Sequence, residues 1–314
     1  MMKKLFFLFL VSPQTISSEI KGDHDDTIVD EDNEDLTDAV NITNISPPSV
    51  KCLVEKLPEL DETKYLVNCA NRNISDEKAI QMKYSNASSI INLSQNLLTE
   101  FPDLNSSNIQ KLEDLDLSYN KITFDHLGVN LRLRPLLSSL NRLDLSHNDI
   151  GNISVSLFKP LNDTDDVPLT ELDLSFNKLT FLPEFLFDSL ENLESLDLSY
   201  NANLGELRSD TASALSSLKN LRTLRLRGCG LSIMPASLMS NLVNLRGLDL
   251  GDNSFHRVDP SLQFAVSLEQ LNLDNNLIDI LDHTSFEGMN GLKNVSIREA
   301  FKWILQLLNF KKLT

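Results

Sequence analysis

The dominant feature of the chain is a recurring spacing of leucines between residue 88 and about residue 300. Each copy has the form Leu-x-x-Leu-x-Leu-x-x-Asn, in which polar residues separate the leucines. Six clear copies end at asparagines, and three weaker copies end at other or less regular positions: Asn120, Asn148, Asn177, Asn201, Asn253 and Asn276, then Asn96, Cys229 and Ala300. The intervals between successive end positions are 23 to 29 residues. The spacing therefore predicts a repeat protein with about nine units.

The same pattern predicts the elements within a unit. Leu-x-Leu is expected to be a short strand with its leucines pointing inward, because successive side chains of a strand face opposite ways. A parallel copy of that strand needs a crossover, which the rest of each unit supplies. In the unit that follows Asn177, four apolar residues are predicted to point into the coil and Pro183 to fix a bend: Leu179, Leu182, Phe187 and Leu190.

The asparagine that ends each copy is predicted to bond unpaired backbone groups of the bend, because its amide offers two donors and an acceptor. Cys229 can fill this role only weakly. Since no unit can bury its own leucines, the units are expected to stack. The predicted fold class is α/β, a right-handed leucine-rich-repeat solenoid (a horseshoe) with a parallel sheet on its concave face.

The segments outside the repeats divide the rest of the chain. Residues 1–18 read as a signal peptide, with Lys3 and Lys4 before an apolar core. Residues 19–48 carry ten acidic residues against one lysine between Glu19 and Val40 and are predicted to be disordered. They are interpreted as a spacer, with an acidic arm for a basic partner or calcium as the alternative. Residues 49–87 form the N-terminal cap, residues 88–300 the solenoid, and residues 301–314 a helical lid or a truncated end.

Cysteines and sequons indicate export. In an oxidising compartment Cys52 and Cys69 are expected to pair and Cys229 to remain a free, buried thiol. Nine Asn-X-Ser/Thr sequons are present: Asn41, Asn44, Asn73, Asn86, Asn92, Asn105, Asn152, Asn162 and Asn294. Asn92 and Asn294 fall on predicted strands, so glycans there would obstruct the two ends of the sheet face. The predicted binding surface therefore runs from Tyr119 to Asn275.

Residues 50 to 300 resemble the extracellular leucine-rich-repeat proteins of the 24-residue class, such as Toll-type receptor ectodomains and Slit-like and chaoptin-like proteins. The segment YLVNCANRNIS, residues 65–75, looks like the end of that family's cysteine-bearing cap. The chain departs from the family in having two cap cysteines instead of four, no cysteine-rich C-terminal cap, and no transmembrane helix or signalling domain after the repeats. The resemblance implies recognition of other macromolecules in immunity, adhesion, guidance or matrix assembly.

Two columns on the predicted sheet face are candidates for ligand binding. The residue before the asparagine is aromatic in four successive units, which predicts a stripe of rings about 15 Å long: Tyr119, His147, Phe176 and Tyr200. Beside it run four aspartates: Asp116, Asp144, Asp173 and Asp197. A row of exposed rings is typical of a binding surface, although these residue types also fill the common consensus. Arg225 and Arg227 interrupt the columns and either set the register of a partner or pair with Asp197 or Asp249.

Charge and motifs exclude several functions. The net charge of −17 disfavours nucleic acid and anionic membranes as partners. The five histidines have no metal-ligand spacing, and the chain has no phosphate loop, CxxC pair or nucleophile elbow, so neither an enzyme, a metal site nor a cofactor is predicted. The predicted function is a secreted or cell-surface module that binds an extracellular protein or glycan ligand. The alternatives are a self-associating matrix or adhesion component and a truncated receptor ectodomain.

Overall fold

The computed structural model describes residues 52–56, 64–75, 88–104, 112–124, 132–162, 166–281 and 284–299. The predicted signal peptide, acidic tract and C-terminal helix lie outside these residues, as do the sequons Asn41, Asn44, Asn86 and Asn105. The domain boundaries proposed for those segments stay predictions.

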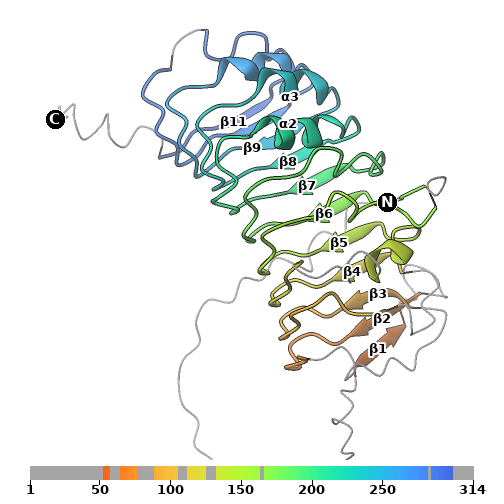
Figure 1. Ribbon diagram of the computed structural model, residues 1–314. Coiled ribbons are helices and arrows are strands. Elements are labelled where there is room, and N and C mark those ends of the chain that lie inside the picture. The colour runs from red at the N-terminus through yellow and green to blue at the C-terminus, as the bar shows by residue number, and fades with distance from the viewer. Residues whose placement is uncertain are drawn as a thin grey trace, which may run out of the picture. The chain divides into compact units, whose positions relative to one another are not determined.

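The described part forms one sheet of eleven strands that follow one another in sequence order (Figure 1). The first two strands pair antiparallel, and every later neighbour pairs parallel. The strands are β1 (Leu53–Lys56), β2 (Tyr65–Asn68), β3 (Ser88–Asn92), β4 (Asp114–Asp116), β5 (Arg142–Asp144), β6 (Glu171–Asp173), β7 (Ser195–Asp197), β8 (Thr223–Arg225), β9 (Gly247–Asp249), β10 (Gln270–Asn272) and β11 (Asn294–Ser296). The predicted leucine-rich-repeat solenoid is confirmed, and β3 to β11 are its nine predicted strands.

Identical residues lie in register through the interior of the stack. The central residue of every strand from β4 to β10 is a leucine, and these leucines pair with one another from strand to strand: Leu115, Leu143, Leu172, Leu196, Leu224, Leu248 and Leu271. All seven are at most 3% exposed. Burying one leucine side chain stabilises a fold by about 2 kcal/mol, so this column is a main source of stability.

The return segments close each coil with a second apolar column. They contain short helices, α2 (Ser209–Ser216), α3 (Ala236–Asn241), η4 (Arg134–Leu136) and η5 (Pro260–Phe264), of which α2 and α3 lie side by side in Figure 1. The residues predicted to point inward after Asn177 are all buried. Phe158 and Phe187, from two successive return segments, stack with ring centroids 5.9 Å apart.

The asparagines that end the repeat copies, here called the asparagine ladder, have the predicted structural role. The Asn177 amide Nδ2 donates to the carbonyl oxygens of Leu145, Leu174 and Ser175, and its Oδ1 accepts from the backbone N–H of Ile150. Six other asparagines of the ladder repeat most of this arrangement. One such residue therefore joins two coils through four backbone groups.

Cys229 takes the asparagine position with weaker contacts. Its Sγ lies 3.2 Å from the Leu198 carbonyl oxygen and 3.7 Å from that of Arg227. The thiol is free and buried, and burial raises its pKa to about 12. It is therefore protonated and unreactive at neutral pH.

The N-terminal end of the stack is closed by a disulfide-bonded hairpin. Cys52 and Cys69 are bonded as predicted, with their Cα atoms 4.6 Å apart. Val67, Cys69 and Ile74 are buried against the first coils. The cap thereby covers leucines that would otherwise face water at the end of the solenoid.

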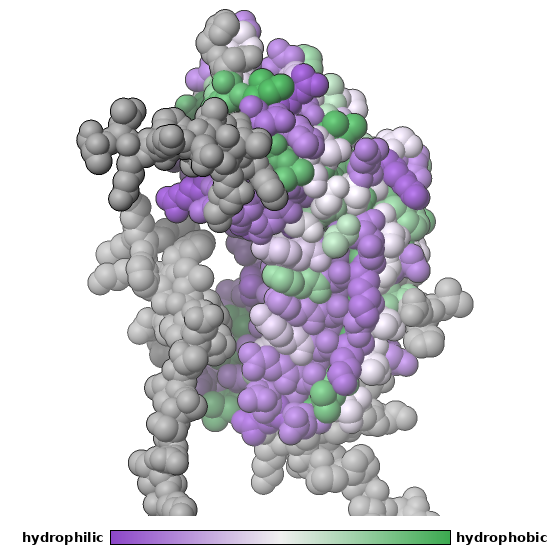
Figure 2. Space-filling model, turned by 90° about the vertical axis from the view of Figure 1, so that its left-hand side faces the viewer, coloured by the Kyte–Doolittle hydropathy of each residue, from purple (hydrophilic) through white to green (hydrophobic). Residues whose placement is uncertain are grey.

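The side of the solenoid seen in Figure 2 is mainly hydrophilic where its residues are described, and its hydrophobic residues form separate patches. Among the described residues, no helix has the length and apolar composition needed to cross a membrane.

Candidate functional site

Four aromatic rings form a stacked column across the coils of β4 to β7. We define the ring column as Tyr119, His147, Phe176 and Tyr200. The ring centroids are 3.9, 4.0 and 4.3 Å apart in that order, and neighbouring rings are inclined by 11°, 11° and 22°. These separations are shorter than the usual strand spacing of about 4.8 Å. The rings predicted to form a stripe therefore contact one another face to face.

The backbone fixes this arrangement. Each ring residue has a positive φ, between 52° and 57°, which turns all four side chains in the same direction. Their backbone N–H groups donate to carbonyl oxygens of the next coil, as Phe176 does to Ser199 at 2.8 Å and His147 to Ser175 at 2.9 Å. The coils thus hold the rings in register beyond the ends of the strands.

The column is open to solvent. Tyr119 is 52% exposed, Phe176 42% and Tyr200 36%. Burial within the stack lowers the pKa of His147, an effect that Asp144 opposes, so the imidazole is neutral at pH 7.4. Because the ring faces cover one another, the column presents mainly ring edges, an uncharged and largely apolar ridge, to a partner.

Gly228 ends the column and leaves room for the last ring. This glycine has φ +63°, and a Cβ at its position would lie 2.7 Å from Tyr200 Cδ1. The Tyr200 hydroxyl donates to Asp252 Oδ2 at 2.7 Å, and Arg227 Nε donates to the same oxygen at 2.8 Å. Asn275 Nδ2 donates to Asp252 Oδ1. Beyond Tyr200 the face therefore changes from aromatic to a closed polar network.

We expect the substitution Gly228→Ala to lower the free energy of unfolding by about 1–2 kcal/mol, because alanine is strained at positive φ and its Cβ would displace the Tyr200 ring. Gly247→Ala is the matched control, since a Cβ there would meet Thr223 at an ordinary 3.7 Å. Urea unfolding of both variants checks the prediction. Equal stability of the two variants would contradict the close contact of Gly228 with the ring.

A row of aspartates runs beside the ring column at the last position of each strand. We define the aspartate row as Asp116, Asp144, Asp173 and Asp197. In each residue Oδ1 accepts the backbone N–H two positions later, at 2.8 to 3.0 Å. Asn92 and Asn272 make the same bond at the equivalent positions of β3 and β10. These aspartates are half-buried, and each closes the turn that follows its strand.

The row is electrostatically crowded. Burial, with Asp144 and Asp197 on the two neighbouring strands, raises the pKa of Asp173 to about 7. Burial and Asp144 likewise raise the pKa of Asp116. Like charges stacked at the spacing of a parallel sheet disfavour one another's ionised forms. The row therefore carries less negative charge at neutral pH than its four carboxyls suggest.

The two arginines next to these columns pair within the molecule. Arg225 NH1 lies 3.8 Å from Asp197 Oδ2, and Arg227 NH1 lies 3.8 Å from Asp249 Oδ1. Asp197 and Asp249, the two partners named from the sequence, are therefore both paired. Arg227 also makes a shorter contact with Asp252. That third partner could not be read from the repeat pattern, because Asp252 belongs to the turn and not to the aspartate row.

The described sequons lie at different parts of the solenoid. Asn92 is the last residue of β3 and Asn294 the first of β11, as predicted, so both flank the strands that carry the ring column. Asn152 and Asn162 are exposed in the return segment after β5, and Asn73 is exposed in the cap. Glycosylation of these sequons stays a prediction.

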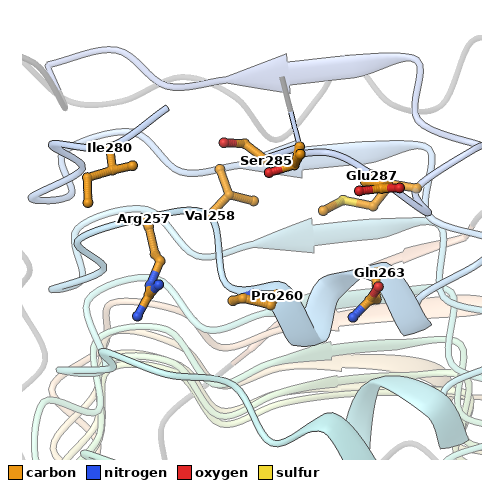
Figure 3. A pocket seen from close by; sticks show the side chains of 9 residues that line it. Arg257, Val258, Pro260, Gln263, Ile280, Ser285 and Glu287 are labelled. Atoms are coloured by element: carbon orange, nitrogen blue, oxygen red, sulfur yellow. The ribbon is translucent and has the colours of Figure 1, made fainter. Parts of the chain in front are cut away.

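A hollow of about 280 Å³ lies between the return segments of the last two described coils. Figure 3 shows Ser285 and Glu287 on one coil and Val258, Pro260 and Gln263 on the other. The Arg257 side chain points away from Ser285 and Glu287. Within the described ranges, no group of three or more His, Cys, Asp or Glu side chains is placed to hold a metal ion.

The sequence was compared with known protein families and proteins. A family model described as leucine rich repeat matches residues 168–231 and 219–278, and a second with the same description matches residues 108–123 and 137–158. Tsukushi from Gallus gallus is 33% identical over 183 residues, 58% of this chain and 46% of Tsukushi. Toll-like receptor 3 from Boselaphus tragocamelus is 32% identical over 219 residues, 70% of this chain and 22% of the receptor. The chain thus spans less than half the length of either relative.

A plant receptor is among the solved structures that are similar to this chain. The plant peptide hormone receptor RGFR1 in complex with RGF2 is 26% identical, with a TM-score of 0.50 over 74% of this chain and 36% of that one. Two of these proteins are named as receptors, Toll-like receptor 3 and RGFR1. The repeat spacing, the eleven-stranded sheet and these matches agree: the chain has the leucine-rich-repeat fold and is similar to extracellular leucine-rich-repeat proteins.

Proposed function

We propose that this protein is an extracellular recognition protein that binds a protein ligand through the sheet face at β4 to β7. The observation that carries the proposal is the ring column, in which Tyr119, Phe176 and Tyr200 are 36% to 52% exposed although they are held in register by backbone hydrogen bonds. Exposed aromatic residues on a rigid support lose little conformational entropy on binding. This makes the column a suitable anchor for a partner.

Three further observations support the proposal. The chain has a predicted signal peptide and nine sequons, which favour secretion. The bonded cysteine pair fits an oxidising compartment. RGFR1 is described as a peptide hormone receptor in complex with RGF2, and a peptide or protein ligand is accordingly proposed for this chain. The surface first predicted from Tyr119 to Asn275 is narrowed to the coils before Gly228, because the polar groups beyond it already bond one another.

The proposal predicts the effect of removing the rings. The triple variant Tyr119→Ala, Phe176→Ala, Tyr200→Ala is expected to weaken ligand binding at least about 100-fold, as loss of clustered hot-spot residues does. The partner is first captured from extracellular fluid with the wild-type chain, and its affinity for each variant is then measured by calorimetry. Thermal unfolding verifies that the variant is folded.

A matched control removes exposed apolar side chains elsewhere. Phe185, Val243 and Val266 lie in the return segments and are 57%, 51% and 62% exposed, so their triple alanine variant should bind like wild type. If the ring variant keeps full affinity while this control loses it, the sheet face is not the binding surface. Concentration-dependent sedimentation without a partner would instead support the self-associating matrix component.

A further inference from the structure

The coils that carry the ring column also carry a concentrated negative charge. In β4 to β7 the first and last strand positions supply six carboxyls: Asp114, Asp116, Asp144, Glu171, Asp173 and Asp197. The same positions supply one basic residue, Arg142, which pairs with Asp144 at 3.1 Å and with Glu171 at 3.5 Å. Arg225 on β8 lies 3.8 Å from Asp197. Six carboxyls therefore face two arginines.

This charge is not required by the fold. The bond that each member of the aspartate row makes to the backbone is made equally well by Asn92 and Asn272. Asparagine would give the same turn without repulsion between neighbouring coils. The raised pKa values of Asp116 and Asp173 show that ionising the row costs free energy in the folded chain. A residue type that costs stability where a neutral one would serve is expected at a functional surface.

The chemistry of the face selects among occupants. A second copy of this chain carries the same net charge of −17 and would be repelled, as would a nucleic acid. Cationic side chains would relieve the repulsion along the aspartate row. The ring column beside the row presents mainly ring edges, which suit an apolar side chain better than a cation, because a cation binds over a ring face and the faces between neighbouring rings are covered.

We propose that the ligand segment bound at β4 to β7 is cationic and apolar, with lysine or arginine side chains over the aspartate row and an apolar side chain against the ring column. The inference rests on the proposed function and specifies the chemistry of its ligand. It also separates the two halves of the sheet, since in the second half Arg227 already pairs with Asp249 and Asp252.

A random peptide library displayed on phage is the probe. It is selected on the wild-type chain, and the selected peptides are then tested on three variants. The first replaces the whole aspartate row by asparagine, which preserves the backbone bonds. The second makes the same change in net charge on exposed return-segment residues: Glu184→Gln, Asp188→Asn, Glu191→Gln and Glu206→Gln. The third is the triple alanine variant of the ring column.

The inference predicts selected peptides that are rich in lysine or arginine and contain an apolar residue. They should bind the asparagine-row variant at least about tenfold more weakly, a loss of about 1.4 kcal/mol, and the return-segment variant like wild type. Peptides without basic residues, or peptides that bind the asparagine-row variant with unchanged affinity, would overturn it. If such peptides lose affinity for the triple alanine variant of the ring column, the proposed function stands and the proposed ligand chemistry is wrong. If they bind both the ring variant and the asparagine-row variant like wild type, both proposals fail.

Discussion

Replacing Asn177 by alanine is expected to lower the free energy of unfolding by about 3 kcal/mol, because a buried polar group left without a partner costs about 1–3 kcal/mol. The amide of this residue serves three carbonyl oxygens and one N–H group from two coils. Its side chain is 8% exposed, so water reaches these groups poorly. Urea unfolding followed by circular dichroism measures the loss.

The control for this substitution is Asn203→Ala, because Asn203 is exposed in the turn after β7 and should change stability by less than about 0.5 kcal/mol. The variant Asn177→Cys should fall between wild type and alanine, since Cys229 shows that a thiol keeps part of these contacts. Equal stability of the Asn177→Ala and Asn203→Ala variants would contradict the structural role of the ladder.

The substitution Asp173→Asn is expected to stabilise the protein by about 2 kcal/mol at pH 8. The full shift of the Asp173 pKa from 3.8 to about 7 would correspond to about 4 kcal/mol, and solvent at the half-buried row reduces this figure. Asparagine keeps the bond to the Ser175 N–H and removes the repulsion with Asp144 and Asp197.

The pH dependence gives this prediction its sign. Because the folded chain holds a proton that the unfolded chain releases at lower pH, the free energy of unfolding contributed by Asp173 falls as pH rises from about 4 to about 7. The advantage of the asparagine variant over wild type should therefore grow across that window and level off above it. Asp173→Ala, which loses the backbone bond, should gain about 1 kcal/mol less. An advantage that is the same at pH 4 and pH 8 would contradict the raised pKa.

Much of the fold could be predicted from the sequence because the same repeat motif occurs nine times. A leucine that recurs at one position of every unit has to face the interior, so the strands, the buried column through Leu172 and the role of Asn177 could be predicted. The position of Tyr119, His147, Phe176 and Tyr200 along one line followed from the same spacing. The disulfide between Cys52 and Cys69 could be predicted from the expected oxidising compartment and from the position of both cysteines in the cap.

The remaining features depend on local geometry that the repeat pattern does not encode. Face-to-face stacking of the rings requires the positive φ of the residue before each asparagine, which a leucine pattern cannot reveal. The bond from the aspartate row to the backbone was not predicted, although asparagine at the same position in two other units, Asn92 and Asn272, was a signal for it. The contact of Arg227 with Asp252 joins residues of two turns whose side-chain directions emerge only in three dimensions.

Covalent capture at one ring position tests the binding surface most directly. Photo-reactive benzoylphenylalanine is placed at Phe176, in the ring column, or at Phe185, an exposed phenylalanine of the return segment, and each chain is irradiated in the presence of its extracellular partner. We expect a cross-linked product from position 176 and none from position 185. A product from position 185 alone would contradict binding at the sheet face.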